Sequence, residues 1–174
     1  MSDLTSYIRN VPDFPKKGIV FRDITTLLKE PKAFEKAIST LQEKYDGTKI
    51  EKVVGVESRG FILGAALALK LGVGFVPIRK KGKLPAETVR EEYSLEYGKD
   101  SIEIHKDAIK PGERILVHDD LLATGGTIDA ACKLVERVGG TIVGLCFLVE
   151  LNFLRGRDRL GKYDIFSLIQ YDKE

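Results

Sequence analysis

The chain has 174 residues, of which 43% are hydrophobic, and its formal net charge is +2. This length suits one domain with a sizeable core, and a charge so close to zero excludes a general nucleic-acid binder. Residues 1–10 are too polar for a signal peptide, and the most apolar stretch, residues 60–76, is broken by Lys70 and two glycines, so we expect a cytoplasmic protein with no membrane partner.

The N-terminal part of the chain lacks a long periodic pattern. Leu4, Ile8 and Val11 suit the inner face of a short first helix. Two prolines and a glycine within residues 12–26 forbid a long regular element, yet the segment is too apolar for a solvated loop. We therefore expect an irregular segment that covers either the core or a ligand.

From residue 31 onward the sequence alternates between helical and strand patterns. Residues 31–45 predict an amphipathic helix, and residues 53–56 predict a strand that is buried on both faces. A helix over residues 61–71 and a strand over residues 75–78 follow. This order is typical of a parallel sheet connected by helices.

Polar segments follow both of these strands. Glu57, Ser58 and Arg59 separate the first strand from its helix, and residues 79–83 contain four cations and a glycine. Either segment could be an ordinary solvated loop. Because ligands bind at the carboxyl edge of a parallel sheet, both segments are also candidates for an anion site.

A highly charged region interrupts the alternation. Residues 87–107 show apolar residues at every second position in places, which predicts a β-hairpin turning at residues 98–100. A hairpin inserted between parallel strands should lie at the sheet edge or form a flap.

Residues 115–127 carry the most informative pattern. Residues 115–117 predict a buried strand, and Asp119 and Asp120, hereafter the acidic pair, follow where the strand should end. A turn then leads into a helical pattern over residues 128–138. This turn, hereafter the phosphate turn, consists of Ala123, Thr124, Gly125, Gly126 and Thr127.

The phosphate turn and the acidic pair suit different parts of one ligand. A helix N-terminus, glycines without Cβ atoms and threonine hydroxyls suit a phosphate, whereas carboxylates suit sugar hydroxyls or a bridging metal. A sugar phosphate meets both demands. The plain alternative is a strand-to-helix connection in which Thr127 is the N-cap.

The C-terminal part completes the alternation. A glycine pair at residues 139–140 ends the helix, residues 141–150 predict a strand, residues 151–160 a loop with a possible helical turn, and residues 165–169 a last strand. Cys132 and Cys146 fall within these apolar patterns, have no disulfide or metal-site spacing, and are expected to be core residues. The predicted fold class is therefore α/β, with a parallel central sheet flanked by helices.

With these segments placed, the sequence resembles the adenine phosphoribosyltransferases of the type I phosphoribosyltransferase family over nearly its whole length. The matching strings, in the family's order, are DFP..GIVFRDIT, VESRGF, IRKKGKLP, SLEYG, HDDLLATGGT and LVEL. The resemblance implies one domain over residues 1–174, with a small hood over residues 1–30, a flexible flap over residues 80–107 and the motif for 5-phosphoribosyl-1-pyrophosphate (PRPP) over residues 115–127.

The resemblance also implies a role for individual residues. Asp119 and Asp120 would accept hydrogen bonds from the ribose hydroxyls, and the phosphate turn would hold the 5′-phosphate. The residues implied at the pyrophosphate are Glu57, Ser58, Arg59, Arg79, Lys80 and Lys83, and the family often has a non-proline cis peptide in the first of these segments.

Other residues are implied at the base. Phe21 and Leu151 match the residues that sandwich adenine, and the backbone of Val20 and Arg22 would read its edge. Glu96 and Tyr97 match flap residues that close over the site. Glu96 and Arg59 would be catalytic, as the proton carrier and as a stabiliser of the leaving charge.

His118 departs from the family, in which hydrophobic residues are common at this position. It should point to the face of the sheet opposite Asp119. We expect a structural histidine rather than a catalytic one.

The implied reaction is that of adenine with PRPP to give AMP and pyrophosphate, in purine salvage. Mg²⁺ is the implied cofactor, bound through pyrophosphate and ribose hydroxyls rather than a definite set of protein ligands, and a homodimer is the implied assembly. Two alternatives stay open: a phosphoribosyltransferase for another base, and a non-catalytic regulator that responds to PRPP.

Overall fold

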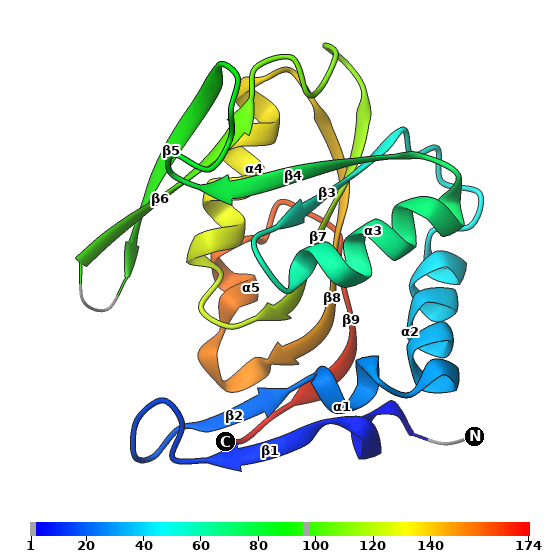
Figure 1. The fold of residues 1–174 in the computed structure, drawn as a ribbon, viewed down its shortest axis with the longest axis vertical. Helices are drawn as coiled ribbons and strands as arrows, with labels where there is room; N and C mark the ends of the chain where they lie inside the picture. The colour runs from blue at the N-terminus through cyan, green and yellow to red at the C-terminus, as the bar shows by residue number, and fades with distance from the viewer. Residues whose placement is uncertain (1–2, 96–97) are drawn as a thin grey trace.

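The computed structural model describes residues 3–95 and 98–174, and a seven-stranded sheet forms its centre (Figure 1). The strand order is β5-β6-β4-β3-β7-β8-β9. Five neighbouring strands run parallel: β4 (Gly74–Lys80), β3 (Lys52–Val56), β7 (Arg114–Leu122), β8 (Thr141–Leu151) and β9 (Ile165–Tyr171). The predicted fold class is thus confirmed.

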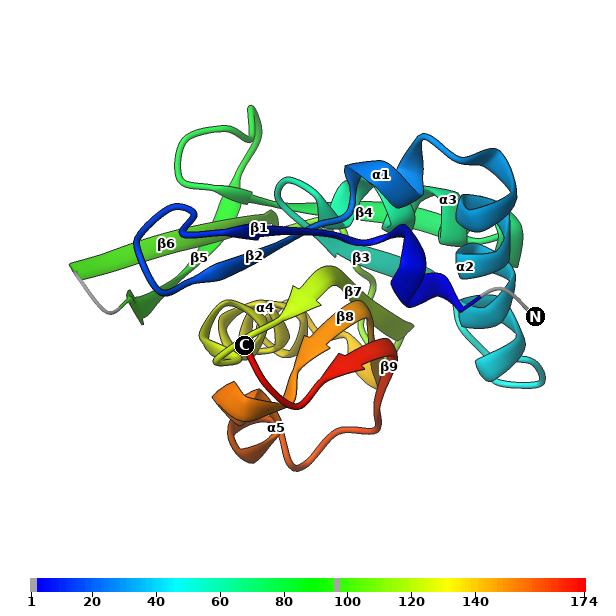
Figure 2. The ribbon, with the colours of Figure 1, turned by 90° about the horizontal axis from the view of Figure 1, so that it is seen from below.

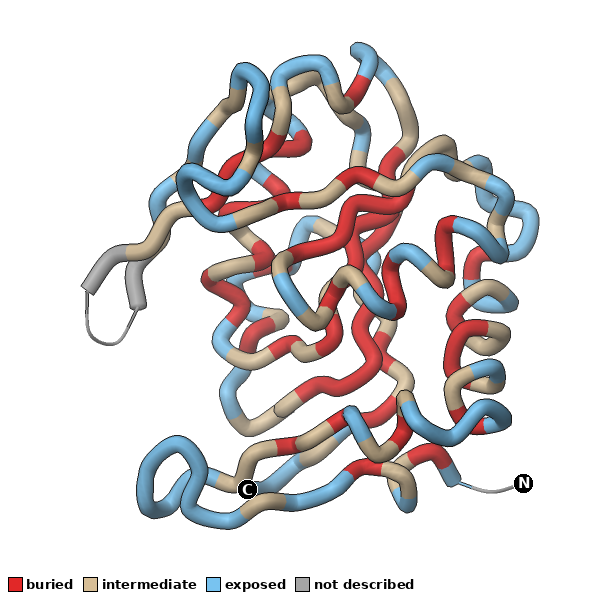
Figure 3. The backbone as a smooth tube through the Cα atoms, viewed as in Figure 1, coloured by how far each residue is buried: buried red, intermediate tan, exposed pale blue. Residues whose placement is uncertain are grey.

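The central strands are buried on both faces, as their unbroken apolar runs predict (Figure 3). β7 is longer than the predicted strand over residues 115–117, and the acidic pair lies inside it. The reason is the difference between its neighbours: β3 pairs with β7 only as far as His118, whereas β8 continues alongside to Leu122. One side of the acidic pair therefore has no neighbouring strand.

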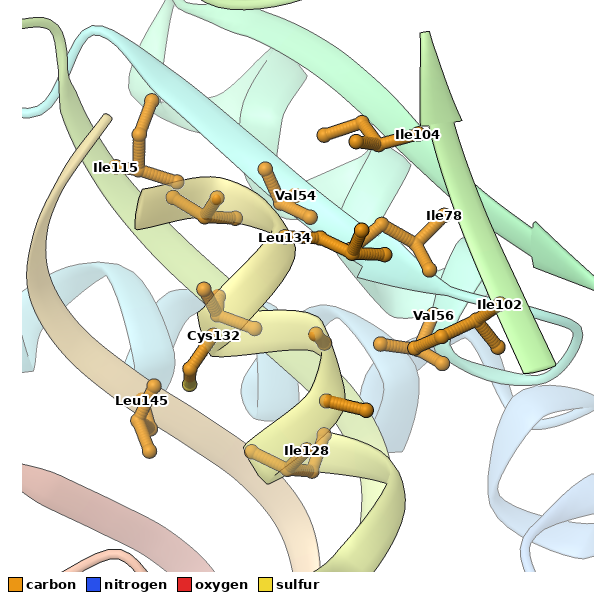
Figure 4. Packing of buried hydrophobic residues seen from close by; sticks show 14 of the residues in the cluster. Val54, Val56, Ile78, Ile102, Ile104, Ile115, Ile128, Cys132, Leu134 and Leu145 are labelled. Atoms are coloured by element: carbon orange, nitrogen blue, oxygen red, sulfur yellow. The ribbon is translucent and has the colours of Figure 1, made fainter. Parts of the chain in front are cut away.

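Helices cover both faces of the sheet (Figure 2). One face is covered by α1 (Thr25–Leu28), α2 (Pro31–Lys44) and α3 (Gly60–Leu71), and the other by α4 (Gly126–Arg137) and α5 (Gly156–Arg159). Successive strand residues alternate between the two sides. Val53 packs with α3, whereas Val54 packs with α4 (Figure 4). The segments predicted as helices over residues 31–45 and 61–71 are confirmed.

Both cysteines are core residues, as predicted. Cys132 of α4 and Cys146 of β8 are fully buried and free. Among the helices of the described residues, none is long and apolar enough to cross a membrane.

The N-terminal segment is more regular than predicted. Leu4–Tyr7 forms a 3₁₀ turn. β1 (Arg9–Pro12) pairs with β2 (Val20–Asp23) in an antiparallel ribbon, where we expected an irregular segment. The ribbon lies apart from the main sheet, at the bottom of Figure 1. Pro12 is accommodated because a two-stranded ribbon consists of edge strands, which do not need every backbone N–H, and Pro15 lies in the connection between the two strands.

The predicted hairpin is present at the edge of the sheet. It consists of β5 (Thr88–Leu95) and β6 (Gly98–His105), and β6 pairs with β4. The predicted turn at residues 98–100 is wrong, because β6 already begins at residue 98. On its inner side the hairpin contacts α4, where Arg137 donates to the backbone oxygen of Arg90 and pairs with Glu91.

Candidate active site

The phosphate turn and the start of α4 form one side of the site. Gly125 is the N-cap residue, and no side chain caps the helix there, so the first N–H groups point outward without an internal partner from the cap. Thr127 lies within the first turn of α4 and is not the N-cap. Asp119 and residues 121–128 line a hollow of about 80 Å³ here. A helix N-terminus beside a small hollow suits an anion.

Gly125 is required by the chain itself. Its φ is +80°, and a Cβ atom there would lie 2.8 Å from the carbonyl oxygen of Gly156. From the sequence, a glycine was expected here because a phosphate approaches the backbone closely. The structure gives an independent reason for a glycine, because α5 packs against the turn.

The acidic pair lies beside one arginine, with Asp120 buried and Asp119 half-buried. The Asp120 N–H donates to Asp119 Oδ1 over 2.9 Å, and Arg59 Nε lies 2.9 Å from Asp120 Oδ2. That contact lacks hydrogen-bond geometry, so within the described residues Asp120 Oδ2 is a buried acceptor without a hydrogen-bond donor. A buried acceptor of this kind calls for a donor from a ligand.

Burial also changes the acidity of the pair. Burial, and then the charge of Asp120, raise the pKa of Asp119 well above its usual range. Burial raises the pKa of Asp120 as well, and the charge of Arg59 opposes that rise. Two adjacent carboxylates in a dry site favour a ligand that donates hydrogen bonds or brings positive charge.

Gly60 contributes to this site and was missed. A Cβ atom at Gly60 would lie only 2.6 Å from Asp119 Oδ1, so only glycine leaves room for that carboxylate. The signal was present in the sequence, because a glycine directly after Arg59 opens a helix at the same sheet edge.

Two of the cations predicted to bind pyrophosphate, Arg79 and Lys83, contact the Glu57 carboxylate, and so does the backbone of Lys80. Its carboxylate accepts from Arg79 Nε over 3.3 Å, from the Lys80 N–H over 2.9 Å and from Lys83 Nζ over 2.5 Å. Burial would raise the pKa of Glu57, but the hydrogen bond from Lys83 and the further donors hold it below its usual value. The Glu57–Ser58 peptide bond is cis, in agreement with the resemblance.

Lys80 also has an internal partner. Its Nζ lies 3.1 Å from Asp100 Oδ2 of the hairpin, and this hydrogen bond and charge raise the lysine pKa. Tyr93 donates to the same Asp100 carboxylate over 3.3 Å. Sequence reasoning missed Asp100, because nothing in its neighbourhood along the chain indicates a contact with Lys80.

The residues predicted at the base lie near the ribbon. Phe21 is half-buried, and the Arg59 guanidinium carbon lies 5.0 Å from its ring centre. Val11, Phe14, Phe21 and Asp23 line an apolar hollow of about 340 Å³. Phe21 thus lies between an apolar hollow and the arginine that contacts the acidic pair.

Arg22 attaches the ribbon to the main sheet. Its buried side chain donates to Asn10 Oδ1 over 2.5 Å and lies 4.0 Å above the ring of Tyr171. Tyr171 ends β9 and is paired with Leu151 at the end of β8, so β2 lies beside the end of β9, one strand away from Leu151. One edge of β2 pairs with β1, which leaves the backbone of the other edge without a strand partner in the described sheets.

His118 is fully buried, on the side of the sheet that α3 covers. Its Nδ1 lies 3.3 Å from Cys146 Sγ, and its Nε2 has no hydrogen-bond partner among the described residues. Burial lowers its pKa to about 4. These contacts favour the predicted structural role. Glu96 and Tyr97, the predicted flap residues, lie outside the described residues.

The comparisons with known proteins cover nearly the whole chain. The phosphoribosyl transferase domain family matches residues 23–174. A curated protein of Solibacter usitatus named adenine phosphoribosyltransferase is 59% identical over 99% of this chain and 100% of its own.

Solved structures agree with the sequence comparison. Adenine phosphoribosyltransferase from Thermoanaerobacter pseudethanolicus is 56% identical, with a TM-score of 0.94 over 97% of this chain and 98% of its own. The enzyme of Saccharomyces cerevisiae, crystallised with an imino-altritol bisphosphate and adenine, is 43% identical, with a TM-score of 0.90 over 95% and 96% of the two chains.

Proposed function

The chain belongs to the phosphoribosyl transferase family, and from that premise we propose that it is an adenine phosphoribosyltransferase, which converts adenine and PRPP to AMP and pyrophosphate in purine salvage. The observation that carries this conclusion is the sequence identity of 59% to a relative of that name over 99% of the chain. In addition, the acidic pair of this chain lies directly beside an uncapped helix N-terminus.

The ribose 5-phosphate part of PRPP would occupy the hollow beside α4. The N–H groups and hydroxyls of the phosphate turn would donate to the 5′-phosphate, and the ribose hydroxyls would donate to the acidic pair. The buried Oδ2 of Asp120 supports this assignment. Within the described residues it has the charge of Arg59 beside it but no hydrogen-bond donor, and a ribose hydroxyl would supply that donor.

The pyrophosphate would lie between Arg59 and the cations around Glu57. Arg59, Arg79, Lys80 and Lys83 would each exchange an internal carboxylate for a phosphate oxygen. Glu57 itself repels an anion, so its side chain would release Arg79 and Lys83 to the pyrophosphate while the backbone of its loop donates to the pyrophosphate.

Adenine would stack against Phe21, with Leu151 on its other face. Stacking does not distinguish adenine from hypoxanthine, because both are flat purines. The free edge of β2, with backbone groups of Val20 and Arg22, would donate to N1 and accept from the 6-amino group. Hypoxanthine reverses that donor and acceptor, and a buried mismatch of this kind can cost a factor on the order of 10⁴ in specificity.

The chemistry needs no protein nucleophile. Adenine N9 attacks C1 of the ribose, the bond from C1 to pyrophosphate breaks with its electron pair, and the N9 proton passes to a base, for which we propose Glu96. The ribose carbon becomes oxocarbenium-like, as in other glycosyl transfers. Arg59 would stabilise the charge on the departing pyrophosphate.

Mg²⁺ fits this site only together with the substrate. The described residues contain no group of three or more His, Cys, Asp or Glu side chains suited to a metal ion. Mg²⁺ commonly uses one or two carboxylates plus substrate phosphates, which matches the acidic pair and PRPP. When bound, it would supply positive charge to the leaving pyrophosphate.

The flap would exclude water during the reaction. Residues 80–95 combine high charge density with a place at the edge of the sheet, and closure over PRPP would prevent its hydrolysis. Limited proteolysis tests this. Cleavage in residues 80–97 should be frequent in the free protein and fall sharply with PRPP and Mg²⁺, and equal cleavage in both states would remove the gating role.

We also propose a homodimer formed through α3. Ile62 and Leu69 are 45% and 84% exposed, and they lie with Ala65 along one face of this helix. A second copy would cover that apolar stripe. Light scattering should give twice the mass of the chain for the wild type and the monomer mass for Leu69→Glu; a monomeric wild type would contradict the proposal.

A turnover assay with PRPP and Mg²⁺ tests the function. Separate reactions with adenine, hypoxanthine, guanine and uracil should give product with adenine alone. Turnover of another base would identify a different phosphoribosyltransferase. Binding of PRPP without turnover of any base would identify a regulator.

A further inference from the structure

We propose that Glu150, Arg157 and Ser167 form a positioning network that sets the base side and the phosphate side of the nucleotide site together. The inference rests on the proposed function, because it concerns the same site. None of the three residues belongs to the predicted binding residues, and they act through the chain segment between Leu151 and Gly156.

The centre of the network is the Glu150 carboxylate, which is only 3% exposed. Arg157 donates to it in a bidentate manner, from Nε over 2.6 Å and from Nη2 over 2.7 Å, and Ser167 Oγ donates over 2.6 Å. Three donors on one buried carboxylate fix its orientation, and the bidentate contact also restricts the planar guanidinium of Arg157.

Arg157 connects three elements. It lies in α5, it holds Glu150 of β8, and its Nη1 donates to the backbone oxygen of Ile165 in β9 over 3.2 Å. The short helix α5 has only four residues and could not keep its place by its own hydrogen bonds. Its position therefore depends on contacts with its neighbours, and this arginine attaches it to β8 and to the start of β9 (Figure 2).

The segment held in this way begins at the base side of the site. Leu151 directly follows Glu150 and ends β8. A 3₁₀ turn, Asn152–Leu154, follows, and Arg155 adopts a φ of +55°. A residue other than glycine in this region is strained and keeps its conformation only where its surroundings hold it.

The segment ends against the phosphate side. A Cβ atom at Gly156 would lie 2.3 Å from the Ala123 carbonyl oxygen, and one at Gly125 would lie 2.8 Å from the Gly156 carbonyl oxygen. The two backbones are thus in direct contact at the phosphate turn. A shift of α5 would move both the wall formed by Leu151 and the turn that holds the 5′-phosphate.

Kinetics of Arg157→Lys and Glu150→Gln test the network. Each variant keeps a polar side chain of similar size but loses the bidentate ion pair. KM for adenine and KM for PRPP should rise together, each by about tenfold, since small misplacements of a binding site are costly. AMP binding measured by calorimetry should weaken by a similar factor, which gives a readout that does not depend on turnover.

Glu113→Gln is the matched control. Glu113 also accepts from a cation and a backbone N–H, Lys52 Nζ at 2.5 Å and the Lys110 N–H at 2.8 Å, but it precedes β7 at the end of the sheet opposite the site. Its kinetic constants and AMP affinity should equal those of the wild type, even if its melting temperature falls.

Three outcomes would overturn the inference. A lower melting temperature with unchanged KM values and AMP affinity would show that the network only stabilises the fold. A change confined to one substrate would show that the two sides are not set together. If a single variant does not fold, the double variant Glu150→Gln/Arg157→Met is tested in its place, because it leaves no unpaired charge. Wild-type KM values in that double variant would equally contradict the network. An inactive wild type would instead refute the proposed function.

Discussion

Replacement of His118 by leucine should remove most of the pH dependence of stability between pH 7 and pH 5. Burial lowers the pKa of His118 from 6.5 to about 4, so in this window the unfolded chain binds a proton that the folded chain does not. The free energy of unfolding therefore falls as the pH falls. With these two pKa values, proton linkage predicts a loss of about 2 kcal/mol from pH 7 to pH 5.

The window separates His118 from the paired carboxylates. A carboxylate such as Asp23, whose pKa is lowered to about 2 by the Thr25 N–H and by Arg9, loses its contribution only as the pH falls below about 4. The acidic pair, with raised pKa values, acts in the opposite direction. Wild type and His118→Leu share all these groups, so the difference between their pH profiles reports His118.

Urea unfolding at pH 7 and pH 5, at one protein concentration, measures the effect. At pH 7 the variant should be within about 1.5 kcal/mol of the wild type, because leucine has a similar volume and needs no partner for a buried nitrogen. Between pH 7 and pH 5 the variant should therefore lose less of its free energy of unfolding than the wild type does. The same loss in both proteins would refute a neutral, buried His118.

Three further predictions concern the site. Asp120→Asn should weaken PRPP binding while the circular dichroism spectrum stays that of the wild type, because an ionised acceptor is lost; unchanged affinity by calorimetry would remove Asp120 from the ribose site. Gly125→Ala should cost about 1–2 kcal/mol from its positive φ alone and more from the contact with α5, and should lower PRPP affinity. Gly112→Ala is the control for Gly125→Ala, because Gly112 has a similar φ of +85° but no atom near the position of the added Cβ. Equal urea midpoints for the two variants would contradict the contact between Gly125 and α5. Phe21→Ala should raise KM for adenine through lost stacking and keep the preference over hypoxanthine; a lost preference would place base selection on the ring instead of the backbone.

The sequence predicted the parts of the fold that depend on local periodicity. The helices over residues 31–45 and 61–71 and the buried strand at 53–56 lie where their apolar patterns put them. The ribbon of β1 and β2 was missed, because each strand has only four residues, β1 is mostly exposed and ends in a proline, and neither strand shows a clear alternation. The extension of β7 to Leu122 was missed because it depends on a neighbouring strand, which a single segment does not reveal.

The site shows the same division. The phosphate turn and the acidic pair could be proposed as a site from the sequence because strand, carboxylates, glycines and helix follow one another in the chain. The contacts of Asp100 with Lys80, and of Arg157 with Glu150, join residues whose separation carries no recognisable spacing. Such pairs become visible only after the elements are placed in space.

The internal pairing of the four cations assigned to pyrophosphate has a consequence for the rates of binding and release. Arg59, Arg79, Lys80 and Lys83 each already face a carboxylate, so the free site presents little net positive field to an approaching anion. We therefore expect the association rate of PRPP to depend only weakly on ionic strength. If these cations bind pyrophosphate as proposed, the carboxylates would stay close to them, and each carboxylate would pair with its cation again as the product leaves. Release would then exchange one anion for another and would expose no unpaired positive charge to water.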